Sequence, residues 1–108
     1  MYFRRILIIL LAWLIFPLSG GAVSLDDGVA AYNDGNYLTA KKIFQELAEQ
    51  GVVVSQRYLA EMYDKGRGVR RDYDKAVHWY KKAAKQSDSR AQYLLGVKYV
   101  NGHGVPLD

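Results

Sequence analysis

A repeat of 36 residues constrains the fold of this chain more than any other feature of its sequence. The residue pairs at this spacing are Gln56 and Gln92, Leu59 and Leu95, Tyr63 and Tyr99, Gly66 and Gly102, Gly68 and Gly104, Val69 and Val105, Asp72 and Asp108, Tyr37 and Tyr73, Ala40 and Ala76, Phe44 and Tyr80, and Ala48 and Ala84. Repeats of ~20 to ~50 residues are typical of solenoids, in which each unit buries its apolar face only against its neighbours. The sequence therefore predicts a stack of similar units.

Apolar residues within each repeat recur at helical spacing. Over residues 73–87 they fall at i, i+3, i+4, i+7 and i+8, which makes one stripe of Ala76, Trp79, Tyr80, Ala83 and Ala84. Similar stripes precede the glycines, namely Leu59, Met62 and Tyr63 in one copy and Ala91, Leu94, Leu95 and Tyr99 in the next. Each repeat is therefore expected to hold two helices. The alanines let a neighbouring helix approach closely, and the aromatic residues fill the remaining space.

Glycines and aspartates mark where these helices end and begin. Gly66 and Gly68 are expected to end one helix and reverse the chain, because glycine tolerates positive φ. Asp72 or Asp74 can then cap the following helix. In the next unit, Asp88 or Ser89 can do the same.

Three consecutive valines, Val52–Val54, conflict with the helical pattern around them. Because β-branched residues disfavour helix, we expect them to form a brief extended join, with the next helix established by Gln56. The alternative is that the valines form the first turn of that helix and pack into an interface.

The matching residues of the central unit are Leu59, Tyr63, Gly66, Gly68, Val69, Asp72, Lys75, Ala76, Trp79, Tyr80, Lys82, Ala83 and Ala84, and the next copy contributes Leu95, Gly96, Tyr99, Gly102 and Gly104. This pattern resembles the Sel-one-like repeat (SLR), a branch of the tetratricopeptide superfamily, in its bacterial exported type. The resemblance implies an all-α fold, an α/α solenoid of antiparallel helix hairpins in a right-handed superhelix. It also implies adaptor or scaffold work on protein partners.

The chain divides into a leader and three units. Residues 25–51 are expected to form a degenerate N-terminal tetratricopeptide-like hairpin, with Asp26 and Asp27 in the first helical turn. Residues 52–87 are a complete SLR unit, and residues 88–108 are the first half of a further SLR unit.

Residues 1–24 have the layout of a secretory signal peptide, expected as a helix ahead of the solenoid. Arg4 and Arg5 precede eleven apolar residues at 6–16, and small residues suit cleavage near Ala22 or Ser24. The expected localisation is therefore periplasmic or secreted. The alternative is an inner-membrane anchor formed by residues 6–16, although this run is shorter than the ~20 residues that span a bilayer.

Composition and spacing argue against several classes of function. The formal charge of +4 includes Arg4 and Arg5, so the remaining chain has 13 basic and 11 acidic residues, and no nucleic-acid partner is expected. The chain has no cysteine, which excludes disulfide and thiol chemistry. His78 and His103 occupy unrelated repeat positions, so no metal site is expected. Catalytic residues and cofactors are not expected either.

Four basic residues cluster around one glycine loop, namely Lys65, Arg67, Arg70 and Arg71. The favoured interpretation is a solvated loop. The functional alternative is contact with an acidic partner, a polysaccharide or a lipid headgroup.

The candidate partner-binding residues lie on the first helices of two units, namely Arg57, Tyr58, Glu61, Gln92, Tyr93 and Lys98. The resemblance makes them the expected contact set, because the first helices of tetratricopeptide-like solenoids line the concave face. The predicted function is an exported, non-enzymatic module that binds a peptide or protein there. The alternatives are a hydrolase acting on β-lactams or peptidoglycan, which the lack of cysteine disfavours, and a membrane-tethered envelope regulator.

Overall fold

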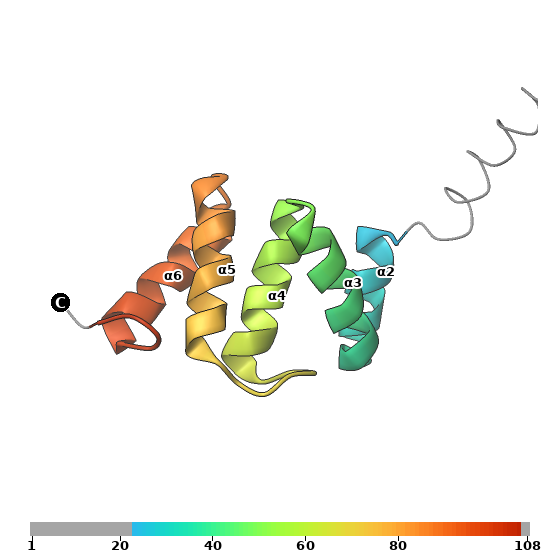
Figure 1. The fold of residues 1–108 in the computed structure, drawn as a ribbon, viewed down its shortest axis with the longest axis horizontal. Helices are drawn as coiled ribbons and strands as arrows, with labels where there is room; N and C mark the ends of the chain where they lie inside the picture. Colours follow the sequence, from blue (N-terminus) through green and yellow to red (C-terminus); the bar gives the residue numbers. More distant parts are fainter. Residues whose placement is uncertain (1–22, 107–108) are drawn as a thin grey trace, which may run out of the picture.

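The computed structural model describes residues 23–106, so the predicted signal peptide lies almost wholly outside the described residues. Within that part of the chain there are five helices and no strand: α2 (Leu25–Asn33), α3 (Tyr37–Glu49), α4 (Val53–Lys65), α5 (Tyr73–Lys85) and α6 (Ser89–Asn101). Each helix packs against the next one along the chain, and Figure 1 shows them stacked in sequence order. This arrangement confirms the predicted all-α solenoid.

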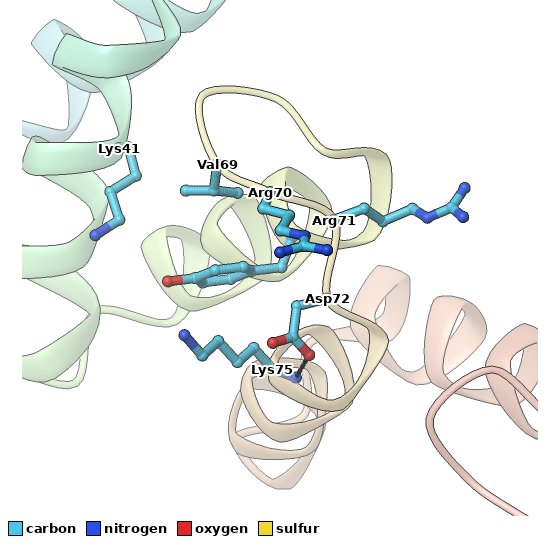
Figure 2. Close-up of a pocket in the computed structure, with 7 residues that line it drawn as sticks. Lys41, Val69, Arg70, Arg71, Asp72 and Lys75 are labelled. Carbon is cyan, nitrogen blue, oxygen red and sulfur yellow. Dashed lines mark hydrogen bonds between the residues drawn. The ribbon is translucent and has the colours of Figure 1, made fainter.

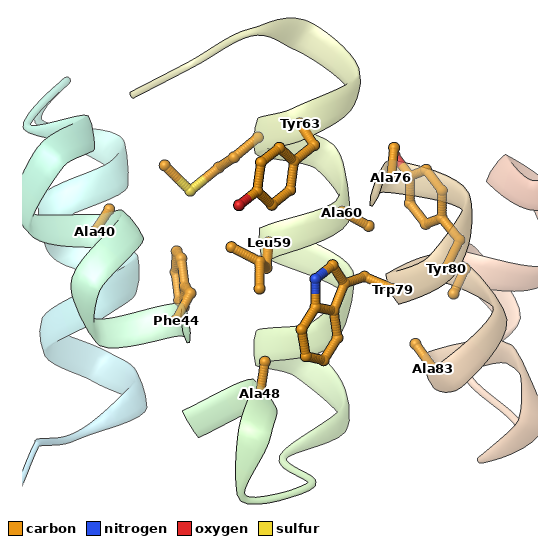
Figure 3. Packing of buried hydrophobic residues seen from close by; sticks show 12 residues of the cluster. Ala40, Phe44, Ala48, Leu59, Ala60, Tyr63, Ala76, Trp79, Tyr80 and Ala83 are labelled. Carbon is orange, nitrogen blue, oxygen red and sulfur yellow. The ribbon is translucent and has the colours of Figure 1, made fainter. Parts of the chain in front are cut away.

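The core runs as a continuous layer between consecutive helices rather than around one centre. Phe44 of α3, Leu59 of α4 and Tyr80 of α5 are its largest fully buried apolar side chains, together with Met62 (Figure 3). Small residues separate them, and the fully buried alanines are Ala40, Ala60, Ala76, Ala83 and Ala91. Because alanine occupies little space, the helices approach closely and the large side chains fill the gaps that remain.

Side-chain caps begin three of the helices. The Ser24 hydroxyl accepts a hydrogen bond from the backbone N–H of Asp27, at the start of α2. Asp72 caps α5 and Asp88 caps α6, which decides between the alternatives that the sequence left open. The carboxylates accept from the N–H groups of the third helical residues, and each cap of this kind typically contributes about 1 kcal/mol.

The expectation of an extended join at Val52–Val54 is wrong for two of the three valines. Val52 is extended and precedes α4, but Val53 and Val54 form the first helical turn. Val53 packs against the buried core, and Gln56, one turn on, donates a hydrogen bond from Nε2 to the backbone oxygen of Ala48. These tertiary contacts with α3 outweigh the weak helix propensity of valine.

The glycine loops repeat in detail. Gly66 and Gly102 end α4 and α6 in the left-handed conformation, each with φ of +68°. Gly68 also has positive φ, and a Cβ there would lie 2.7 Å from the backbone oxygen of Tyr37. At the matching position of the next repeat, a Cβ on Gly104 would lie 2.6 Å from the backbone oxygen of Tyr73. The second glycine of each loop is therefore required for the loop to pack on the preceding hairpin.

Gly68→Ala should destabilise the protein more than Gly35→Ala. Gly35 has φ of +79° and open space around it, so alanine there meets only backbone strain, which costs about 1–2 kcal/mol. Gly68→Ala adds a steric conflict with Tyr37, and we expect a total loss of about 3 kcal/mol in the free energy of unfolding. Urea unfolding followed by circular dichroism measures both values. Equal losses would show that the loop does not need this close approach.

Candidate functional site

Ion pairs connect α4 to α6, the first helices of successive units. The Lys98 ammonium donates a hydrogen bond to Oδ1 of Asp64, and both side chains are nearly buried. Arg90 donates from Nε to Oε1 of Glu61 over 3.4 Å. Because these partners lie on different units, the pairs determine how the two helices are placed relative to each other.

Three of the six predicted partner-binding residues belong to this network. Glu61 and Lys98 are each only 6% exposed. Arg57 lies between two carboxylates, with Nη1 3.5 Å from Glu61 and Nε 3.1 Å from Asp88. The structure thus places these charged groups between units, where they contact each other.

The other three predicted residues lie in two different environments. Tyr58 is half-buried and stacks on Phe44 with ring centroids 4.6 Å apart. Gln92 is exposed and donates from Nε2 to the backbone oxygen of Ala84. Tyr93 is 70% exposed on α6. Of the six, Gln92 and Tyr93 are therefore the two that lie together on open surface.

A shallow groove of about 400 Å³ runs along α6 and is lined by Gln92, Tyr93, Gly96, Val97 and Val100. We call it the α6 groove. Tyr93 and Val100, which is 77% exposed, are among the most exposed large apolar residues of the described chain. An apolar surface of this kind offers a place where another apolar surface can bind.

The repeat shows how the α6 groove arises. At an offset of 36 residues, Arg57, Glu61 and Asp64 of α4 correspond to Tyr93, Val97 and Val100 of α6. The α4 residues form the ion pairs to α6 and to its N-cap Asp88, whereas their α6 counterparts are apolar. The outward surface of α6 therefore suits an apolar partner instead of a helix that carries matching charges.

Asp64 also interacts with the buried tyrosine of α5. The Tyr80 hydroxyl donates to Oδ2 of Asp64 over 3.2 Å. Burial, and next the adjacent Asp64 carboxylate, raise the pKa of Tyr80 far above its usual range. The hydroxyl therefore stays protonated and remains a donor, so Asp64 links α4 to α5 as well as to α6.

The four residues of the predicted basic loop divide into two pairs. Lys65 lies 3.7 Å from Glu61, and Arg67 donates from Nη1 to the Tyr32 hydroxyl over 2.9 Å. This hydrogen bond, the largest cause, raises the pKa of Arg67 above its ordinary value. Lys65 and Arg67 thus contact polar side chains of the protein itself, while the exposed Arg70 and Arg71 form no ion pair within residues 23–106.

A second hollow, of about 480 Å³, lies between α3, the glycine loop and α5, and is lined by Lys41, Tyr63, Val69, Arg70, Arg71, Asp72 and Lys75. We call it the basic cleft. Figure 2 shows Lys41 of α3 and Lys75 of α5 extending toward the same space, whereas the guanidinium of Arg71 points away. Three separate elements therefore bring positive charges together at one place.

The histidines do not converge on a site. His103 stacks on Tyr73 with ring centroids 4.3 Å apart, and His78 lies edge-on to Trp79. Among residues 23–106 no group of three histidine, cysteine or acidic side chains is placed to hold a metal ion. In the same part of the chain, no helix has the length and apolar character that crossing a membrane requires.

The Sel1 repeat model matches residues 53–88 and 89–108, which together make up more than half of the chain. The chain belongs to the Sel1 repeat family. The two matches begin one residue later than the units drawn from the sequence. Sel1 repeats typically mediate contacts between proteins and form scaffolds rather than catalytic domains.

Two curated relatives come from Arabidopsis thaliana, the ERAD-associated E3 ubiquitin-protein ligase components HRD3A and HRD3B. They are 39% and 32% identical to this chain over 69 residues, or 64% of it. That stretch is only 10% of HRD3A and 11% of HRD3B, so the chain corresponds to a small part of either protein.

Two solved Sel1 repeat structures share the fold. A Sel1 repeat protein from Oxalobacter formigenes is 31% identical, with a TM-score of 0.74 over 82% of this chain and 35% of its own. A protective antigen of uropathogenic Escherichia coli with an SLR fold is 28% identical, with a TM-score of 0.77 over 90% of this chain and 22% of its own.

Sequence reasoning missed several residues that shape these surfaces. Lys41 and Lys75 were not connected with the basic loop, because they join it only when α3 and α5 pack on either side of α4. Asp64 and Val100 were not singled out either. The sequence did contain a signal for these two residues. Asp64 and Val100 occupy the same position of successive repeats, and a change there from a charged to an apolar residue indicates that the two positions contact different partners.

Lys98→Met should destabilise this Sel1 repeat chain by about 3 kcal/mol, because it leaves the Asp64 carboxylate nearly buried without its counter-charge. Adding Asp64→Asn removes that charge and keeps an acceptor for Tyr80. The double variant is therefore expected to be more stable than Lys98→Met alone. Urea unfolding of both variants tests this. A double variant that is no more stable than the single one would show that the pair is not an energetic unit.

Proposed function

We propose that this Sel1 repeat chain is an exported, non-enzymatic interaction module that binds an apolar segment of a protein partner on α6. The binding surface is the α6 groove, on the concave face that the first helices of such solenoids line. Its central contact is Tyr93, with Val100 beside it. The role is that of an adaptor or scaffold that holds a partner in place.

The observation that carries this proposal is the change from charged to apolar residues between α4 and α6. Arg57 and Asp64 of α4 form ion pairs with charged residues of the next unit. The residues at the matching positions of α6 are Tyr93 and Val100, which carry no charge. Tyr93 combines a large apolar ring with a hydroxyl that stays in solvent, and such residues are enriched at the energetic centres of interfaces. The α6 groove therefore has the composition of a binding surface.

The comparisons support a role in assembly. The Arabidopsis relatives are named as components of a ubiquitin-protein ligase, which describes membership of a larger complex. The role proposed for this chain is binding to another protein, whereas membership of a ubiquitin ligase is a property of the plant relatives.

Photo-crosslinking locates the partner surface directly. A photoreactive residue in place of Tyr93 is expected to capture a protein in the native cells, which mass spectrometry identifies. The same residue in place of Leu38, which is 72% exposed on α3, serves as the control and is expected to capture nothing specific.

Affinity measurements then test the α6 groove with the purified partner. Tyr93→Ser combined with Val100→Ser should weaken binding by at least about tenfold, because each lost apolar contact is worth roughly 1.5–3 kcal/mol when fully buried. Leu38→Ser should leave the affinity unchanged, and neither variant should alter thermal unfolding since all three side chains are exposed. Equal affinities for both variants would refute the proposed surface.

We also propose that the chain reaches the periplasm or the cell exterior through the leader at residues 1–24. The support is the order of a short basic segment, an apolar run and small residues at the cleavage positions. N-terminal sequencing of the protein from native cells should begin at Val23 or Leu25. An intact Met1 would favour the membrane-anchored alternative instead.

A further inference from the structure

We infer that the basic cleft binds carboxylates of an acidic peptide segment. This inference rests on the proposed role as an interaction module and names the chemistry of a second contact. The cleft lies between α3 and α5, whereas the α6 groove is on α6, so the two surfaces do not share a lining residue.

The cations of the basic cleft have no ionic partner among the described residues. Ion pairs within residues 23–106 use four other cations, namely Arg57, Lys65, Arg90 and Lys98. In the cleft, the Lys75 ammonium instead lies 5.3 Å from the ring centre of Tyr63. No ion pair of the described residues therefore neutralises the positive charge gathered here.

The Sel1 repeat pattern includes Lys75, but it accounts for neither Lys41 nor Arg70. At an offset of 36 residues, Lys41 corresponds to Val77 and Arg70 corresponds to Pro106. The structural residues of the same loop, such as Gly68, recur in the next copy. A cation that served the fold would be expected to recur as well, so the cluster at this one loop indicates a role outside repeat packing.

The single carboxylate of the cleft is already occupied. Asp72 accepts a hydrogen bond from the backbone N–H of Lys75 and caps α5. It offsets only part of the charge of Lys41, Arg70 and Lys75. A ligand that carries negative charge would find three donor side chains that approach from three elements, and the fork of Arg70 can bind a carboxylate with two hydrogen bonds.

The rest of the lining favours a carboxylate on a carbon chain over inorganic phosphate. Tyr63 and Val69 provide apolar surface beside the cations. The aliphatic part of a glutamate side chain can pack there while its carboxylate reaches the cations, whereas phosphate has no apolar part. Asp72 repels a phosphate dianion more strongly than a monovalent carboxylate. An acidic peptide therefore matches both the charge and the apolar surface of the cleft.

Binding of a rhodamine-labelled oligoglutamate peptide to the chain as purified from cells tests the inference by fluorescence anisotropy. We expect binding that weakens with added salt, and no binding of a labelled oligoglutamine peptide. Lys41→Gln combined with Lys75→Gln should weaken the affinity by at least about tenfold, since hydrogen bonds to charged groups are the stronger kind. Arg70→Glu, on an exposed loop position, should weaken it at least as much.

The chain offers a charge-matched control. Lys42→Gln combined with Lys81→Gln removes two exposed lysines from the same two helices, outside the cleft lining, and should leave the affinity unchanged. Equal affinities of the two double variants would overturn the inference. Binding of oligoglutamine, or binding of inorganic phosphate without oligoglutamate, would overturn it too.

The same assay separates this inference from the proposed function. The variant with Tyr93→Ser and Val100→Ser keeps the basic cleft, so it should bind oligoglutamate as the unaltered chain does. The unaltered chain could fail to bind oligoglutamate while replacement of Tyr93 and Val100 still abolished partner binding. That result would disprove the inference about the basic cleft and leave the proposed function standing.

Discussion

Burial of apolar surface between neighbouring hairpins is the constraint on which this structure depends. A pair of helices as short as α4 and α5 cannot enclose its own apolar side chains, so Phe44, Leu59 and Tyr80 are buried only because α3, α4 and α5 lie next to one another. Fully buried alanines make this approach possible. Any surface that the chain presents to a partner is therefore supported by the stack, since each unit buries apolar side chains against its neighbours.

Charge in this molecule is used in two different ways. Between α4 and α6, lysine and arginine side chains are paired with carboxylates, and the pairs position one unit on the next. In the basic cleft, Lys41, Arg70 and Lys75 gather without a carboxylate partner among the described ion pairs. Paired charges near the core contribute to a specific arrangement of the helices, whereas unpaired charges at a cleft create a positive potential that attracts an acidic ligand.

In a repeat protein, binding surfaces are expected at positions where successive copies differ in sequence. The glycines that turn the chain and the alanines that separate helices recur because every unit needs them. In contrast, Tyr93 and Val100, like Lys41 and Arg70, differ from the residues at the matching positions of the other copy. They produce an apolar groove at one unit and a basic cleft at another. Two chemically distinct surfaces on one stack of helices suit the proposed role of an adaptor or scaffold.

The sequence by itself determined the helices, the turns and the repeat architecture. The signals for these are local: glycine at a position with positive φ, aspartate before a helix, and apolar residues at helical spacing. Only the tertiary structure decided that Val53 begins a helix, that Lys98 pairs with Asp64, and that Lys41 joins the glycine loop. Each of these depends on contacts between residues far apart in the chain, and the distances between packed helices are set by side chains that no local pattern specifies.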